Sequence, residues 1–214
     1  MCAGCIFLKP RVFVDSFVKK CNTHLLNIAW IIGYRALSCE ELEVGGDLGK
    51  SIDSPRVLQK IVISSSSVSE VRNTLAGVNY KSMFVTVEPL SMEVARWSTH
   101  DTRVDTILIT SRNTELFDKK QLGIMKYYSK PLEIPLPHLL GEDRAESALY
   151  RRIRLYASSR VPLVISSMAT HWHELIHPYS LLKFLRLSYD IPERIGLLAG
   201  SDIPWFIISR KEGV

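Results

Sequence analysis

The sequence predicts an irregular TIM-like (β/α) barrel, in which mostly parallel strands are surrounded by helices. Short apolar runs alternate with amphipathic stretches along most of the chain, a pattern typical of parallel sheets with right-handed crossovers. Several apolar runs end in small hydroxyl or acidic residues, as strands do where loops follow the carboxyl edge of a sheet. No dinucleotide-type glycine fingerprint follows any run, which disfavours the alternative of an open doubly wound sheet. With 214 residues, the chain is long enough for one such domain over 1–214.

The first half of the chain supplies the opening strands. Val12 to Asp15 reads as a strand, and Asn22-Thr23 can cap a helix that continues to about Ala36. Gly77 is expected to stop a later helix. Further strands are predicted at 6–8, 41–44, 60–63 and 82–87, and helices at 68–76 and 91–99.

The second half continues the alternation and then ends in consecutive helices. Asp190, Pro192 and Glu193 have the spacing of a cap, a first-turn proline and an acidic partner, so a helix is expected from there to Gly200. The other predicted strands are 104–109, 131–136 and 161–165, and the other helices are 119–128, 142–158, 178–189 and 201–210. This gives seven strands, with one or two more uncertain near the N-terminus.

The bulk composition limits the class of protein. The net charge of +5 permits a polyanionic partner without requiring one. No apolar run approaches the ~20 residues that cross a bilayer, and the first residues are too few for a signal peptide, so a cytoplasmic protein with no membrane contact is expected. The four cysteines, at 2, 5, 21 and 39, are expected to be reduced and partly buried thiols; a zinc site at Cys2-x-x-Cys5 is the alternative.

One group of residues suggests a metal-dependent phosphoesterase. His171 and His173 would share a face of an extended segment, so both could reach one ion. Asp15 and Glu88 follow predicted strands and could supply carboxylate ligands at a barrel rim. The alternative is that the histidines lie on a polar loop and face solvent or a partner.

Two further catalytic patterns each lack a required element. Ser166 or Ser167 with His171 has no G-x-S-x-G elbow. The loop 45–50 ends in Gly-Lys followed by serine, but the first glycine of a phosphate-binding loop is missing.

Basic residues are the stronger candidates for binding. Guanidinium and ammonium groups gathered on one face would bind phosphates and release counterions. Because aromatic residues are not interleaved with them, we expect contacts to the shape and backbone of RNA rather than base stacking. The predicted RNA-binding residues are Arg112, Lys130, Arg151, Arg152 and Arg194.

The order and spacing of these features resemble the archaeal ribonuclease P protein component 3 family. The resemblance covers most of the chain from about Val12 and is firmest from Val104 onward. The stretches that carry it are Val104-Asp105, Leu132-Glu133-Ile134, the arginine-rich helix that follows, Val164-Ile165-Ser166-Ser167 and Pro178-Tyr179. Met168, Ile176 and Ser180 depart from the family pattern, which often has alanine, arginine and aspartate at these places.

The resemblance implies a protein subunit of the ribonucleoprotein that removes the 5′ leader of precursor tRNA. In that assembly the RNA holds Mg²⁺ and carries the chemistry, so this chain would have no catalytic residues and no cofactor of its own. It would bind ribonuclease P RNA and the component 2 protein, and contact precursor tRNA indirectly. The family is also similar to the polymerase-and-histidinol-phosphatase barrels, but Val14-Asp15-Ser16-Phe17 lacks the His-x-His that those enzymes have after their first strand. A purely structural scaffold that binds only component 2 is the third possibility.

Overall fold

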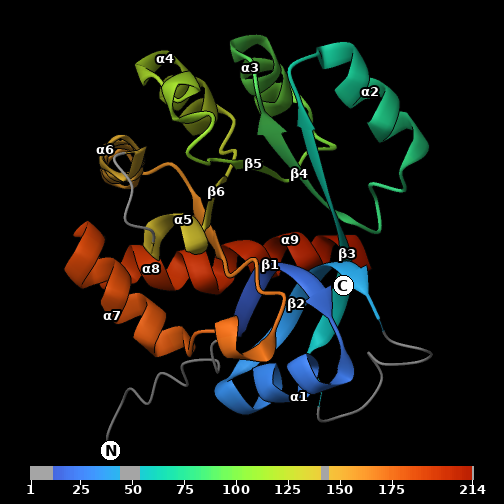
Figure 1. The fold of residues 1–214 in the computed structure, drawn as a ribbon. Helices are drawn as coiled ribbons and strands as arrows, with labels where there is room; N and C mark the ends of the chain where they lie inside the picture. Colours follow the sequence, from blue (N-terminus) through green and yellow to red (C-terminus); the bar gives the residue numbers. More distant parts are fainter. Residues whose placement is uncertain (1–11, 44–53, 141–144, 214) are drawn as a thin grey trace, which may run out of the picture.

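The computed structural model describes residues 12–43, 54–140 and 145–213. The predicted strand at 6–8, the Cys2-x-x-Cys5 pair and the loop 45–50 lie outside the described residues. Figure 1 shows the strands inside a layer of helices. The strands are β1 (Phe13–Cys21), β2 (Tyr34–Leu42), β3 (Arg56–Ser65), β4 (Phe84–Pro89), β5 (Thr106–Leu108), β6 (Leu132–Pro135) and β7 (Leu163–Ser166).

All strand pairs are parallel and follow one another in sequence order from β1 to β7. The seam between the last and first strands is joined just past β7. There the Met168 amide donates to the Phe17 carbonyl at 2.8 Å, and the Lys19 amide donates to the Ala169 carbonyl at 2.8 Å. The ring of strands is therefore nearly closed, which confirms the predicted irregular TIM-like barrel.

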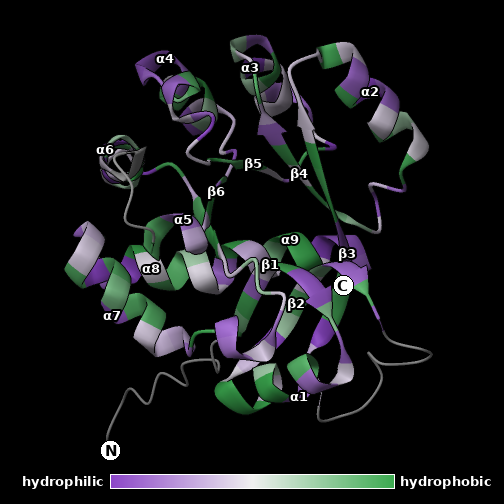
Figure 2. Ribbon diagram, in the orientation of Figure 1, coloured by the Kyte–Doolittle hydropathy of each residue, from purple (hydrophilic) through white to green (hydrophobic). Residues whose placement is uncertain are grey.

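The helices cover the barrel from outside and close one of its ends. Figure 2 shows hydrophilic and hydrophobic segments alternating along α2, α3 and α4, as expected for helices with one side on a core. No helix within the described ranges is long and apolar enough to cross a membrane. The helices are α1 (Thr23–Ile32), α2 (Val68–Gly77), α3 (Met92–His100), α4 (Lys119–Tyr127), α5 (Pro137–Leu140), α6 (Ala145–Ser158), α7 (Pro178–Tyr189), α8 (Glu193–Gly200) and α9 (Asp202–Glu212), with short 3₁₀ turns η1 (Thr114–Leu116) and η2 (Trp172–Glu174).

Helix α9 closes the end of the barrel at which the strands begin. Ile207 and Ile208 of α9 pack against an apolar layer formed by Val14, Leu58 and Phe84, near the starts of β1, β3 and β4. Arg210 and Lys211 fix the end of this helix because both reach the buried carboxylate of Asp105, at 2.6 and 2.8 Å. At the opposite end of the barrel, the strands finish and the loops follow them.

The segment after β1 corrects one predicted boundary. Asn22 caps α1 as expected, by accepting from the Leu25 amide. The helix stops at Gly33, whose φ of 111° is in the left-handed region, and not at Ala36. Ala36 instead lies in β2, a strand of 9 residues of which only the end was predicted. The apolar run from Leu25 to Leu37 is thus a helix followed by a buried strand, two elements that hydrophobicity alone does not separate.

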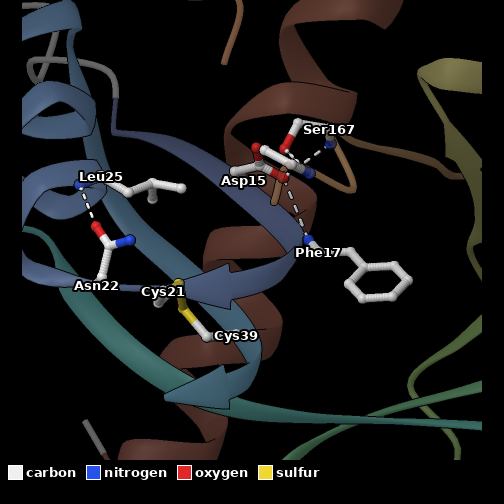
Figure 3. Close-up of a disulfide and its surroundings, with 8 residues drawn as sticks. Asp15, Phe17, Cys21, Asn22, Leu25, Cys39 and Ser167 are labelled. Carbon is white, nitrogen blue, oxygen red and sulfur yellow. Dashed lines mark hydrogen bonds between the residues drawn. A yellow bond between two sulfur atoms is a disulfide. The ribbon is translucent and has the colours of Figure 1, made fainter. Parts of the chain in front are cut away.

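Two more expectations are corrected. Asp190 does not cap α8; its φ of 54° places it at the left-handed end of α7, while Pro192 precedes α8. Cys21 and Cys39 are not free thiols, because they form a disulfide between β1 and β2 with Cα atoms 5.9 Å apart (Figure 3). Both residues are completely buried. A separation of 18 residues gave no sign that adjacent strands would bring the two sulfurs together.

Candidate functional site

The interior of the barrel holds a buried ion pair between β3 and β6. The Lys60 ammonium donates to both Glu133 carboxylate oxygens, at 2.8 and 2.9 Å, and to the Ser16 carbonyl at 2.8 Å. It also lies over the rings of Phe17 and Phe84, at 4.7 and 4.4 Å from their centroids. All three ammonium hydrogens therefore have acceptors. Burial lowers the pKa of Lys60, and the Glu133 carboxylate acts in the opposite direction.

Two threonines complete the coordination of Glu133. Thr86 and Thr106 donate to one carboxylate oxygen at 2.9 and 2.6 Å, and their hydroxyls lie 2.7 Å apart. Neither side chain of the ion pair is exposed. With four hydrogen bonds on its two oxygens, this carboxylate is engaged by protein groups and the centre of the barrel is a packed polar core.

A second carboxylate lies at the end of the barrel where the strands finish. Glu88 accepts from Thr110 at 2.8 Å, from Ser64 at 2.5 Å and from Arg112 at 2.6 Å. Partial burial acts to raise the pKa of Glu88, but these three hydrogen bonds outweigh it and bring the pKa below its usual value. Arg112 follows β5 at this end of the barrel, with its side chain 65% exposed and its guanidinium partly neutralised by Glu88.

Asp15 lies on β1, and its side chain faces the segment after β7 and the helices α7 and α8. One of its oxygens accepts from the amides of Ser167, at 3.0 Å, and Phe17, at 3.2 Å (Figure 3). It lines a small hollow together with Leu181 of α7 and Gly200 of α8. Burial raises the pKa of Asp15 to about 6 despite these hydrogen bonds.

The histidine pair lies on the exposed turn η2. The rings of His171 and His173 stack with centroids 5.5 Å apart, and Glu174 accepts from the His171 amide at 3.2 Å. Among the described residues, no group of three or more His, Cys, Asp or Glu side chains could hold a metal ion. The residues proposed for a phosphoesterase site, Asp15, Glu88, His171 and His173, are therefore not gathered as a metal centre.

The five predicted RNA-binding residues do not share one face. Arg112 follows β5, at the end of the barrel where the strands finish. Arg194, on α8, lines a hollow of about 620 Å³ with residues that precede β7, at the opposite end. Arg151 and Arg152 lie on α6, where Arg151 is exposed and Arg152 half-buried.

Lys130 does not fit the predicted role. Its side chain is buried, and its ammonium donates to the carbonyls of Asp101 and Val104, at 2.9 and 2.5 Å. Burial lowers the pKa of Lys130 to about 8. Lys130 precedes β6 and its two acceptors precede β5, so it links the segments that lead into two neighbouring strands and contributes to the fold rather than to a surface.

Sequence reasoning missed two groupings that the structure brings together. The Lys60–Glu133 pair had a visible signal, because each is a single charge in a predicted buried strand and the charges are opposite. The second is a groove between α2 and α3 that contains Arg72, Arg96 and Trp97. Its signal was weak, since the two arginines lie on different helices.

Fold and site together define a TIM-like α/β barrel whose inner polar groups bond to one another. The fold is similar to that of a chain in an archaeal ribonuclease P structure with mature tRNA, with a TM-score of 0.75, 14% identity, and coverage of 94% of this chain and 91% of that one. It is also similar to a prolidase complexed with N-methylphosphonate-L-proline (TM-score 0.62, 10% identity, 94% and 74% covered). A third similar structure is A. niger ochratoxinase (TM-score 0.60, 8% identity, 92% and 71% covered). At these identities the likeness concerns the fold alone.

Sequence similarity identifies a more specific relative than the fold does. The chain is 29% identical over 190 residues to ribonuclease P protein component 3 of Aeropyrum pernix, an alignment that covers 82% of each chain. No family model matches the chain. The predicted resemblance to archaeal ribonuclease P protein component 3 is confirmed by this similarity.

Proposed function

We propose that this chain is a protein subunit of an archaeal-type ribonuclease P that supports the catalytic RNA in removing the 5′ leader of precursor tRNA. The single observation that carries the proposal is the similarity to component 3 over 82% of both chains. The barrel adds support for a role that leaves the chemistry to the RNA, since the carboxylates of Glu88 and Glu133 are already hydrogen-bonded to neighbouring side chains.

In this proposal the chain binds the catalytic RNA and supports its folded shape. In this proposal Mg²⁺ belongs to the RNA subunit, component 2 is the protein partner, precursor tRNA is contacted indirectly, and the assembly works in the cytoplasm. Arg112, Arg151, Arg152 and Arg194 are the proposed RNA contacts. Lys130 is left out because it is buried.

Reconstitution tests the proposal directly. Precursor tRNA cleavage would be measured with ribonuclease P RNA and component 2, with and without this chain, over a range of Mg²⁺ concentrations. We expect the chain to lower the Mg²⁺ that half-maximal cleavage requires, because a bound cationic protein helps an RNA to fold. Identical Mg²⁺ dependence with and without the chain would refute the proposal.

A salt titration separates RNA contact from a scaffold that binds only component 2. Affinity for ribonuclease P RNA is expected to fall steeply with salt, and neutralising an arginine that contacts a phosphate should reduce the slope by about 0.7 to 0.9. Arg194→Gln is the test variant and Lys130→Met the control, since a buried ammonium bonded to carbonyls releases no counterion. Crosslinking to RNA only in the presence of component 2 would favour the scaffold.

A further inference from the structure

A groove of about 1060 Å³ runs between α2 and α3, on the outside of the barrel. These two helices lie side by side in Figure 1. From α2 the groove receives Arg72 and Asn73, and from α3 it receives Arg96, Trp97 and His100. Two guanidinium groups, an indole ring and amide and hydroxyl groups therefore meet in one open hollow on the surface.

Arg72 differs from the other arginines that lie over tryptophans. Three such pairs occur within the described residues: Arg35 over Trp30 at 3.9 Å, Arg56 over Trp205 at 5.0 Å, and Arg72 over Trp97 at 5.4 Å. The first two guanidinium groups are held elsewhere as well. Arg35 donates to the carbonyls of Trp30 and Tyr34.

Arg56 is paired with Glu212 at 2.8 Å. Arg72, in contrast, makes no hydrogen bond or ion pair with any described residue. It is free to move off the indole and contact a ligand while another planar group takes its place.

Arg96 provides a second, independent observation. Among the described residues its buried Nε has no hydrogen-bond partner, and its one ion pair there is a long contact of 4.0 Å between a terminal nitrogen and Asp118. The Arg96 side chain as a whole is 37% exposed, so its terminal nitrogens can form charge-assisted hydrogen bonds to an anionic oxygen in the groove. Glu93 also lines the groove, so its charge is only modestly positive and a ligand must gain affinity from more than charge.

We propose that the groove between α2 and α3 binds an unpaired nucleotide of RNA, with its base on the Trp97 ring and its phosphate between Arg72 and Arg96. Base stacking on an aromatic side chain together with a cationic contact to the phosphate is the chemistry of single-strand recognition. An acidic peptide would satisfy the arginines but would leave the indole unused. That RNA is the ligand rests on the proposed function; the location and geometry rest on the groove alone.

The experiment measures binding of fluorescein-labelled penta-adenylate by fluorescence anisotropy at low salt. Trp97→Leu is expected to weaken binding by roughly tenfold, the size of one lost base–aromatic stack, and Arg96→Gln by a similar factor. Trp30→Leu is the matched control, because it removes another arginine-covered indole outside the groove; its affinity should stay within twofold of the wild type.

An abasic pentamer of equal charge separates stacking from charge. The wild type should bind it about as weakly as Trp97→Leu binds penta-adenylate, and Trp97→Leu should weaken it no further. Equal affinity of Trp97→Leu and Trp30→Leu for penta-adenylate would overturn the proposal. So would displacement of penta-adenylate by oligoglutamate at equal charge concentration, which would indicate a surface that reads charge only.

Failure of this inference is distinguishable from failure of the proposed function. If the chain supports precursor tRNA cleavage but penta-adenylate binding ignores Trp97, only the groove is refuted. If penta-adenylate binding depends on Trp97 but the chain does not change cleavage, the groove stands and the ribonuclease P assignment is refuted.

Discussion

The buried pair of Lys60 and Glu133 gives the sharpest test of how the barrel is held together. At 2.8 Å and an effective dielectric constant of 20, two unit charges attract by about 6 kcal/mol, and burial of both charges offsets much of this. Lys60→Met would leave the Glu133 carboxylate buried with only two threonine donors. Glu133→Leu would leave an ammonium in the barrel without its counter-charge. Each single change is therefore expected to lower the free energy of unfolding by about 3 to 5 kcal/mol.

The double variant Lys60→Met/Glu133→Leu should cost far less than the sum of the two. It removes both charges, and the Thr86 and Thr106 hydroxyls can still bond to each other, so the main loss is the acceptor of one hydroxyl and the donor to the Ser16 carbonyl. We expect a net cost of no more than ~2 kcal/mol and a coupling energy of at least ~3 kcal/mol. Urea unfolding followed by circular dichroism would measure all four proteins.

An exposed pair of the same length provides the control. Arg154 and Asp190 are also 2.8 Å apart, but their side chains are 48% and 77% exposed. The same cycle on this pair should give under ~1 kcal/mol of coupling. Single variants of the buried pair that each cost less than ~1 kcal/mol, or a double variant that costs the full sum, would refute the account of the barrel core.

Three further predictions concern stability. The pKa of Asp15 is raised to about 6 from 3.8, so the folded state holds this proton more tightly and stability is lost as pH rises from about 4 to 6. Relative to Asp15→Asn, the wild type should lose up to ~3 kcal/mol of unfolding free energy across that window. Parallel pH profiles of the two proteins would contradict this. Replacing Cys21 and Cys39 with alanine should lower the free energy of unfolding by about 3 kcal/mol relative to the oxidised wild type, because the disulfide closes a loop with a separation of 18 residues. The variant and the reduced wild type should have the same denaturation midpoint. A midpoint equal to that of the oxidised wild type would exclude a stabilising role for the disulfide. Lys211→Met should weaken the attachment of α9 to Asp105 and expose amides of α9 to faster hydrogen exchange than those of α6, whereas equal acceleration in both helices would indicate a general rather than local effect.

The alternation of strands and helices could be predicted because local signals carry it. Helix α7 was predicted with its observed limits because Pro178 starts it and its apolar spacing is regular. Strand β2 was largely missed because its buried residues continue the apolar run of α1, and only Gly33 marks the change. The boundary depended on one backbone conformation rather than on hydrophobicity.

The polar core of the barrel was less predictable, because the alignment of the strands decides which distant residues meet there. Lys60 and Glu133 are 73 positions apart, and they meet only because β3 and β6 face each other across the interior. Lys130 illustrates the opposite error: a lysine before a strand reads as a surface charge, yet its ammonium donates to carbonyls of the segment that precedes β5. Charge in a sequence does not reveal whether a partner is water, RNA or a carbonyl group.

The way the carboxylates are used explains why binding chemistry is better sought outside this barrel than within it. A metal ligand or general base needs a free lone pair facing solvent or substrate. The Glu133 oxygens accept hydrogen bonds from Lys60 and two threonines, and the Glu88 oxygens accept from Ser64, Thr110 and Arg112. Among the described residues one Asp15 oxygen has no partner, but the Asp15 side chain is buried and lines a small hollow against α7 and α8. By contrast, Arg96 has only a 4.0 Å ion pair among the described residues, and Arg72 has no hydrogen bond or ion pair with them. Both lie on helices outside the barrel, where a long flexible polymer such as RNA could reach them.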